Sequence, residues 1–155
     1  MEIFLATGNL HKKHEMQMLC EPNKITIPAD IGLNFDPEET GKTFFENALI
    51  KAESLWEIVQ KPVIADDSGI CVHALNDFPG VYSARFMEGQ SYDLKNKALN
   101  EMLSKFDDKT AHYTCAIVLV NKEENIEKYF EGKCYGTIIS PIEGPYGFVY
   151  DPIFV

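Results

Sequence analysis

The stretch from Val63 to Val72 (Val-Ile-Ala-Asp-Asp-Ser-Gly-Ile-Cys-Val) constrains the fold more than any other part of the chain. Two apolar runs flank the adjacent carboxylates of Asp66 and Asp67 and a Ser-Gly pair. This pattern predicts a buried strand that brings acidic side chains to an opening, with a bend at the Ser-Gly pair. Two neighbouring carboxylates are costly to bury alone, so a metal ion or a basic partner is expected beside them. The competing interpretation is an ordinary Asp-rich turn between two strands. The stretch taken alone favours this turn, but the segments on either side of it favour the strand.

The N-terminal segment has the order strand, turn, helix. Residues 2–6 read as a strand, residues 7–9 (Thr-Gly-Asn) as a turn, and residues 10–19 have helical spacing of apolar side chains. The free N–H groups and the dipole at such a helix start favour an anion, and Lys12 lies in the first turn. The sequence is not a Walker motif. A phosphate cradle and a solvated helix face therefore remain equally good interpretations.

A long helix is predicted from Thr43 to about Gln60. Its apolar positions follow a helical stripe, and Thr43 with Glu46 three residues later matches a capping box. This gives Glu46 a structural role. Lys51 falls in the helix interior, where a surface lysine is the default expectation.

The remaining elements complete an α/β pattern. Strands are predicted at 24–29, 111–120 and 126–139, a helix at 92–106, and an apolar aromatic strand at the C-terminal end after a Gly/Pro turn. Residues 30–41 form an acidic loop. Arg85, the single arginine of the chain, either clamps a phosphate or ties down a loop. Early βα units followed by long strands predict a mixed sheet in an α/β fold.

Charge and composition exclude several classes of function. The net charge of −10 argues against a nucleic-acid polymer as partner but not against a small anionic substrate. No apolar run has membrane-spanning length, and no membrane partner is expected. The four cysteines are far apart, without CxxC spacing, and are expected to be small buried hydrophobes in a reducing compartment. The protein is therefore expected in the cytoplasm.

Four separated blocks, taken together, resemble one family, the inosine triphosphate pyrophosphatases, also called non-standard purine nucleoside triphosphate pyrophosphatases. The blocks are Thr7-Gly8-Asn9-Leu10-His11-Lys12; Glu39-Thr40-Gly41 with Thr43-Phe44, Glu46-Asn47-Ala48 and Lys51-Ala52; Ala65-Asp66-Asp67-Ser68-Gly69 continuing to Pro79-Gly80-Val81-Tyr82-Ser83-Ala84-Arg85; and Gly147-Phe148 with Tyr150-Asp151-Pro152-Ile153-Phe154. The resemblance covers nearly the whole chain in matching order.

This resemblance implies Mg²⁺-dependent hydrolysis of ITP, dITP or XTP to the monophosphate and pyrophosphate, which clears damaged purines from the nucleotide pool. It also implies an elongated mixed β-sheet with helices forming two lobes around a central cleft, in a homodimer. Splitting the α–β bond needs an in-line water, a base near it and cations that offset the charge of the leaving pyrophosphate.

The resemblance also assigns roles to single residues. Asp67 and Lys12 are implied as the catalytic residues, with Asp67 acting as general base. The implied magnesium ligands are Glu39 and Asp67. The implied substrate-binding residues are Thr7, Gly8, Asn9 and Lys12 at the triphosphate, Lys51, Ser68 and Arg85 in positioning, and Phe148 and Asp151 at the base.

Two departures from the family pattern leave alternatives open. Val149 stands where the family has glycine, and the family continues past residue 155 with a lysine, a Ser-His-Arg cluster and a final helix. Residues 1–155 are thus expected to form a single pyrophosphatase domain lacking the C-terminal part of the family fold. The alternatives are a nucleotide-binding module with weak or no turnover, and a related hydrolase of other modified nucleotides, such as pyrimidines.

Overall fold

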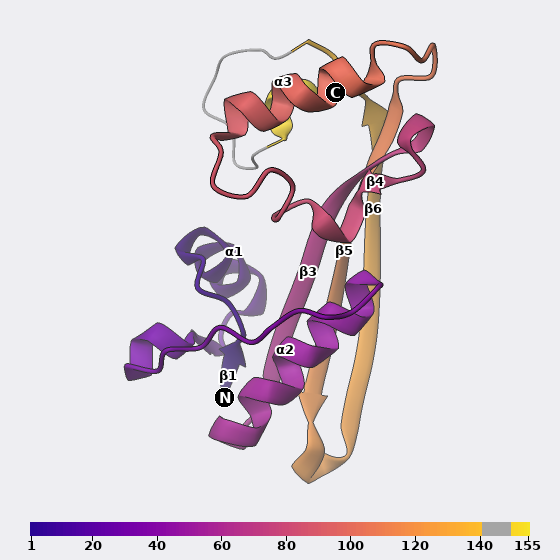
Figure 1. The fold of residues 1–155 in the computed structure, drawn as a ribbon. Coiled ribbons are helices and arrows are strands. Elements are labelled where there is room, and N and C mark those ends of the chain that lie inside the picture. The colour runs from indigo at the N-terminus through magenta and orange to yellow at the C-terminus, as the bar shows by residue number, and fades with distance from the viewer. Residues whose placement is uncertain (141–149) are drawn as a thin grey trace. The chain divides into compact units, whose positions relative to one another are not determined.

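The computed structural model of the chain describes residues 1–140 and 150–155 (Figure 1). Its helices are α1 (Leu10–Cys20), α2 (Phe44–Val59) and α3 (Tyr92–Leu103). Its strands are β1 (Glu2–Leu5), β2 (Lys24–Thr26), β3 (Val63–Val72), β4 (Phe78–Pro79), β5 (Thr110–Asn121) and β6 (Ile126–Thr137). Among the described residues, no helix is both long enough and apolar enough to cross a membrane.

The described strands form one sheet in the order β2-β1-β3-β5-β6, with β4 paired to β3. β1 pairs in parallel with both β2 and β3, whereas β4 runs antiparallel to β3. A short turn over Lys122–Glu124 joins β5 to β6, which a parallel pair does not permit. The predicted mixed α/β sheet is therefore confirmed.

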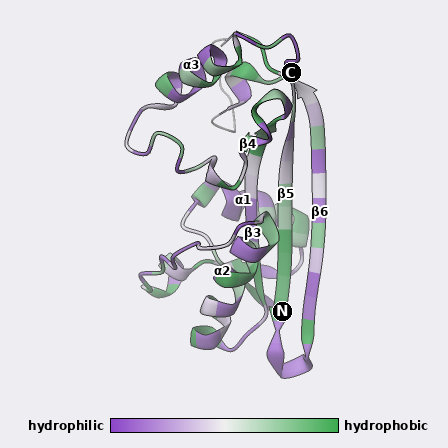
Figure 2. Ribbon diagram, turned by 45° about the vertical axis from the view of Figure 1, so that its right-hand side comes forward, coloured by the Kyte–Doolittle hydropathy of each residue, from purple (hydrophilic) through white to green (hydrophobic). Residues whose placement is uncertain are grey.

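The chain divides into two compact units. Unit 1 comprises Met1–Asp67 and Ala116–Glu131, and unit 2 comprises Ser68–Cys115 and Gly132–Val155. β5 buries alternate residues along most of its length, whereas β6 is exposed almost throughout. Figure 2 shows a continuous hydrophobic stretch along the lower part of β5, whereas hydrophilic and hydrophobic residues alternate along β6.

Unit 1 is organised around the packing of α2. Thr43 caps this helix by accepting a hydrogen bond from the Glu46 N–H (3.1 Å), and Gln60 ends it in the left-handed conformation (φ 50°). The Glu46 carboxylate accepts the Lys42 N–H instead of that of Thr43, so the capping box is only half formed. The α2 core contains buried residues from α2, β1 with the residue after it, β3 and β5: Phe4, Ala6, Ala48, Ala52, Leu55, Val63, Ala65, Val118 and Val120. A smaller cluster contains Leu5, Ile25 and Ile27.

Unit 2 has its own hydrophobic core beneath α3. Ser91 caps the helix by accepting the Leu94 N–H (3.3 Å), and the helix buries Leu99 and Leu103. The other buried members of this core are Ile70, Val72, Ala111, Ile138, Tyr150 and Ile153. Each unit therefore contains a hydrophobic core of its own.

Three local predictions are wrong. β3 continues without a bend through Ser68 and Gly69, because strand pairing outweighs the local turn preference of these residues. The strand predicted at 24–29 ends at Thr26 and is followed by a 3₁₀ turn over Pro28–Ile31, since Pro28 has no N–H to donate to a ladder. At the C-terminal end, Asp151–Ile153 is a 3₁₀ turn, and only an isolated bridge joins Phe154 to Ile138.

The cysteine prediction is only partly right. All four cysteines are free thiols, but Cys71 alone among them is buried and Cys134 is exposed. Cys134 was expected to be buried because it lies in a partly apolar segment. That segment is β6, which is exposed almost throughout.

Candidate functional site

β3 places Asp66 in the interior of unit 1. Its side chain is only 8% exposed, and its Oδ2 lies 2.7 Å from Nζ of Lys12 on α1. A buried carboxylate needs such a partner, because burial without a cation penalises the charged form. The basic partner predicted for the acidic pair is therefore present, and Lys12 does not lie on a purely solvated helix face.

Asp67 is the more unusual member of the acidic pair. Its Oδ2 is buried and has no hydrogen-bond partner among the residues that the structure describes. Burial raises the pKa of Asp67 from 3.8 to about 6; Lys51 lowers it, and Glu39 raises it further. Asp66 also raises the pKa, by a smaller amount. A carboxylate held in this condition is suited to accept a cation or a proton.

Lys51 links the acidic loop to β3. Its Nζ lies 3.1 Å from Oε1 of Glu39 and donates a 2.5 Å hydrogen bond to the backbone carbonyl of Asp66. The lysine side chain is only 14% exposed. The expectation of a surface lysine is therefore wrong, because two acceptors draw the ammonium group inward.

Asn47 is a site residue that the sequence analysis did not select. It is fully buried on α2, and its Oδ1 accepts the N–H of Gly41 (2.7 Å). Its Nδ2 is buried without a hydrogen-bond partner, and its amide lowers the pKa of Asp67. A Cβ on Gly41 would lie 2.6 Å from Asn47 Oδ1, so this approach requires glycine. The sequence did contain a signal for this residue, because Asn47 is a polar amide among the apolar positions of the predicted helix.

The turn before α1 is held by its own side chains. Asn9 Oδ1 accepts the N–H groups of His11 (2.9 Å) and Lys12 (3.3 Å), and Thr7 Oγ1 accepts the N–H of Asn9 (3.1 Å). Gly8 has open space where a side chain would begin. The N–H groups predicted to cradle a phosphate thus have an internal acceptor in this structure.

Three other predicted substrate-binding residues belong to unit 2. Ser68 follows Asp67 on β3. The Arg85 guanidinium lies 5.3 Å from the ring centroid of Tyr82. Asp151 lies near Tyr113: burial, and then the charge of Asp151, raises the pKa of the Tyr113 hydroxyl. Phe148 and Val149 lie outside the described residues.

The structure therefore brings Lys12, Glu39, Lys51 and Asp67 together in unit 1, with Asp66 and Asn47 between them. Glu39 and Asp67 offer carboxylate oxygens, the ligands that Mg²⁺ prefers. The two ammonium groups offer point charges to phosphate oxygens. This arrangement can bind a hard divalent cation and a polyphosphate and accept a proton.

Comparison with known proteins agrees with this chemistry. The model of the Ham1 family matches residues 3–155 of the chain. The dITP/XTP pyrophosphatase of Treponema denticola is 46% identical over 159 residues, which cover 99% of this chain and 81% of the relative. The enzyme of the same name from Leptospira interrogans is 47% identical over 160 residues, covering 99% and 80%.

Solved structures give the same relationship at the level of the fold. The Staphylococcus aureus Ham1 protein superposes with a TM-score of 0.90 at 36% identity, covering 99% of this chain and 80% of that one. A HAM1 protein from Coxiella burnetii also has a TM-score of 0.90 at 36% identity, covering 99% and 81%.

Proposed function

Because the chain belongs to the Ham1 family, we propose that it hydrolyses ITP, dITP and XTP to the nucleoside monophosphate and pyrophosphate. The observation that best supports this function is Asp67, a buried carboxylate with an unpartnered oxygen beside Glu39, Lys51 and Asp66. A carboxylate with these neighbours can hold a divalent cation and accept a proton from water, and the cleavage of a phosphoric anhydride uses both functions. The biological role is removal of non-standard purines from the nucleotide pool.

Magnesium is the proposed cofactor, and the residues present fit it. Oδ2 of Asp67 lacks a partner, and the charge of Glu39 is close enough to raise the pKa of Asp67. A divalent cation held by Glu39 and Asp67 would offset the repulsion between the two carboxylates. Water and phosphate oxygens would supply its other ligands. When bound, Mg²⁺ supplies charge that offsets the negative charge developing on the phosphates.

The two lysines are proposed to bind the triphosphate. Lys12 pairs with Asp66, and Lys51 pairs with Glu39. A polyphosphate brings more charge than either carboxylate, so each ammonium group can exchange or share its partner when the nucleotide binds. Lys51 also holds the backbone at Asp66, which fixes the position of the neighbouring Asp67.

Asp67 is proposed as the general base. Its pKa of about 6 leaves the carboxylate mostly ionised at neutral pH while keeping it more basic than an exposed aspartate. It would accept a proton from the water that attacks the α-phosphorus, and pyrophosphate would leave in line with that attack.

The other assignments stay predictions based on the resemblance. Thr7, Gly8 and Asn9 are proposed at the triphosphate, Ser68 and Arg85 in positioning the substrate, and Phe148 and Asp151 at the base. A homodimer and a cytoplasmic location are proposed on the same ground.

Product identification with a panel of nucleoside triphosphates tests the function. We expect pyrophosphate and monophosphate from ITP, dITP and XTP in the presence of Mg²⁺, much slower turnover of ATP and GTP, and no turnover after chelation. Release of orthophosphate alone would refute the assignment. Calorimetric binding of ITP without any product would support the nucleotide-binding module, and preference for a modified pyrimidine would support the related hydrolase.

A further inference from the structure

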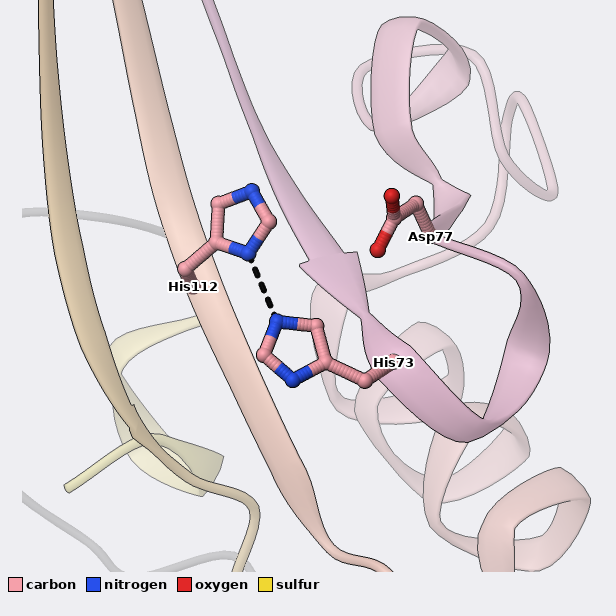
Figure 3. Close-up of side chains that lie close together, drawn as sticks. All are labelled: His73, Asp77 and His112. Carbon is pink, nitrogen blue, oxygen red and sulfur yellow. Dashed lines mark hydrogen bonds between the residues drawn. The ribbon is translucent and has the colours of Figure 1, made fainter.

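Unit 2 contains a second cluster of metal-ligating side chains. His73, Asp77 and His112 each offer one ligand atom, and these atoms all lie within 4.8 Å of one another. Figure 3 shows the two imidazole rings facing each other, with the Asp77 carboxylate beside them. All three residues belong to unit 2, whereas Glu39 and Asp67 belong to unit 1, and the proposed hydrolysis uses none of the three.

The chain path after β3 creates this cluster. His73 begins a 3₁₀ turn over His73–Leu75, and the next two residues, Asn76 and Asp77, are both left-handed (φ 53° and 63°). The N–H groups of these two residues return to the carbonyls of His73 and Val72 (3.2 and 3.0 Å). The side chain at position 77 is thereby brought back beside position 73. Asn and Asp are the residue types that tolerate this conformation.

A hydrogen-bond chain fixes which nitrogen of His73 is available. The Thr110 hydroxyl donates to Oδ1 of Asp108 (2.6 Å), so its own oxygen must accept from Nδ1–H of His73 (2.8 Å). In the neutral ring, Nε2 then has a free lone pair. A carboxylate or hydroxyl behind a histidine is the usual arrangement that orients a metal-ligating imidazole.

The lone pair on Nε2 points at the second histidine. Nε2 of His73 lies 2.7 Å from Nδ1 of His112, so in the metal-free protein the two rings share one proton. That proton occupies the position that a cation would take. Both nitrogens would bind the ion after the proton leaves, with a small outward movement of the rings, since metal–nitrogen bonds are about 2.0–2.1 Å long.

We propose that His73, Asp77 and His112 bind a late divalent transition-metal ion, with Zn²⁺ as the best match. Two imidazoles and one carboxylate are ligands suited to Zn²⁺, Co²⁺ or Ni²⁺, whereas Mg²⁺ prefers oxygen ligands alone. Three protein ligands leave a fourth, open position for water. The ion is distinct from the magnesium ion of the proposed hydrolysis.

The three ligands differ in exposure, which suits a structural ion that can enter from solvent. His112 is 9% exposed, and the Tyr135 ring lies 5.2 Å from its ring, which shields one side. Asp77 is exposed and leaves a path for the ion. Binding would link the His73–Asp77 turn to β5. His73 and His112, which lie on these two segments, are 39 residues apart in the sequence. We expect the ion to stabilise unit 2.

Metal titration of the whole chain tests this proposal. Isothermal calorimetry with Zn²⁺, and visible absorption with Co²⁺, would be measured in excess Mg²⁺, which occupies oxygen-rich sites. We expect one tight Zn²⁺ per chain, a Co²⁺ spectrum typical of four or five ligands including nitrogen, and a higher Tm. The Asp67→Asn variant should behave as wild type, which separates this site from the site of hydrolysis.

Four variants test two of the ligands and the Thr110 hydroxyl that orients His73. Asp77→Asn keeps a residue type that tolerates the left-handed backbone and should abolish stoichiometric binding, as should His73→Gln. Thr110→Val should weaken binding by about ten- to a hundredfold, and Thr110→Ser should restore it. His14→Gln and Asp107→Asn, which alter exposed residues outside the cluster, are the matched controls and should bind normally.

Absence of stoichiometric Zn²⁺ binding in the wild-type chain would overturn the proposal. Equal binding by the wild type and by both Asp77→Asn and His73→Gln would overturn it as well, because the ion would then lie elsewhere. Since neither readout depends on nucleotide turnover, these results are independent of the outcome for the proposed function.

Discussion

At the scale of single residues, Asp67 shows a conflict between stability and chemistry. Its Oδ2 is buried without a partner, and burial is the first cause of its raised pKa. The charge of Lys51 offsets only part of the cost of burying this carboxylate, and a bound cation would offset more of it. Asp67 is therefore expected to lower the stability of the substrate-free protein.

The substitution Asp67→Asn should stabilise the metal-free protein above pH 6. A carboxyl with a raised pKa binds its proton more tightly when folded, so the free energy of unfolding falls as pH rises from 3.8 to about 6. The shift corresponds to roughly 3 kcal/mol at most. Urea unfolding should show Asp67→Asn equal to wild type near pH 4 and more stable at pH 7 to 8. A wild-type protein as stable as the variant at pH 8 would contradict this account.

The pH dependence of hydrolysis should report the same group. Because the base and metal ligand must be ionised, kcat/KM for ITP should fall as pH falls through about 6 and level off above it. Measurement between pH 5 and 9 at a Mg²⁺ concentration well below saturation checks this, because bound Mg²⁺ would itself lower the pKa of Asp67. An acid limb near pH 4 would mean that an ordinary exposed carboxylate controls the rate.

The sequence predicted the partners of single residues where charged residues are adjacent in the chain. The Asp66-Asp67 pair predicted a basic partner, and Lys12 occupies that place. Lys51 was expected at the surface, and Asn47 was not selected, because their partners Glu39 and Gly41 come from a loop whose path no local pattern specifies. Long-range contacts of this kind depend on tertiary packing.

At the scale of elements, the acidic loop and the start of α2 act together. Gly41 donates its N–H to Asn47, and the Lys42 N–H donates to Glu46. These two bonds join the loop that contains Glu39 to the first turn of the helix. The position of Glu39 should therefore depend on the close approach at Gly41.

The substitution Gly41→Ala should impair both stability and hydrolysis. The new Cβ would lie 2.6 Å from Asn47 Oδ1 and from Glu46 Cβ, so the loop must move. We expect unfolding to become easier by about 1–3 kcal/mol. Displacement of Glu39 should lower kcat/KM by up to about a hundredfold.

Gly132→Ala is the matched control, because open space surrounds that glycine on β6. Chemical unfolding and steady-state kinetics of both variants make the comparison. Unchanged kinetics in Gly41→Ala would show that Glu39 does not depend on this contact.

The helices were the most predictable elements. α1 and α2 lie within one residue of their predicted ends, because caps and apolar spacing are local signals. The continuous path of β3 was not predictable in the same way. Its Asp-Asp-Ser-Gly centre has the composition of a turn, and only pairing with neighbouring strands keeps it extended.

At the scale of the whole molecule, the α2 core of unit 1 and the core of unit 2 share two long strands. β3 and β5 each contribute buried residues to the cores of both units, and β6 also has residues in both units. The order of the predicted strands and helices indicated the α/β class, but the division of the chain into units could not be inferred from that order. Both units are built from segments that are not continuous in sequence.

A core truncation in either unit should destabilise the whole chain. Leu55 in unit 1 and Leu99 in unit 2 are fully buried, so replacement by alanine should lower the free energy of unfolding by about 2–5 kcal/mol in each case. Because β3 and β5 continue through both units, circular dichroism and hydrogen exchange should report one cooperative transition. Two separate transitions in Leu55→Ala would show that the units unfold independently.

The most direct test of the central claim is the rate of pyrophosphate release from ITP by Asp67→Asn, compared with wild type and with Asp107→Asn at saturating Mg²⁺. Loss of a general base that also holds the cofactor should lower kcat by about 10²–10⁴-fold or more, in a protein at least as stable as wild type. Asp107→Asn should retain the full rate. If Asp67→Asn releases pyrophosphate as fast as the wild type, the buried carboxylate of β3 is not the centre of the reaction.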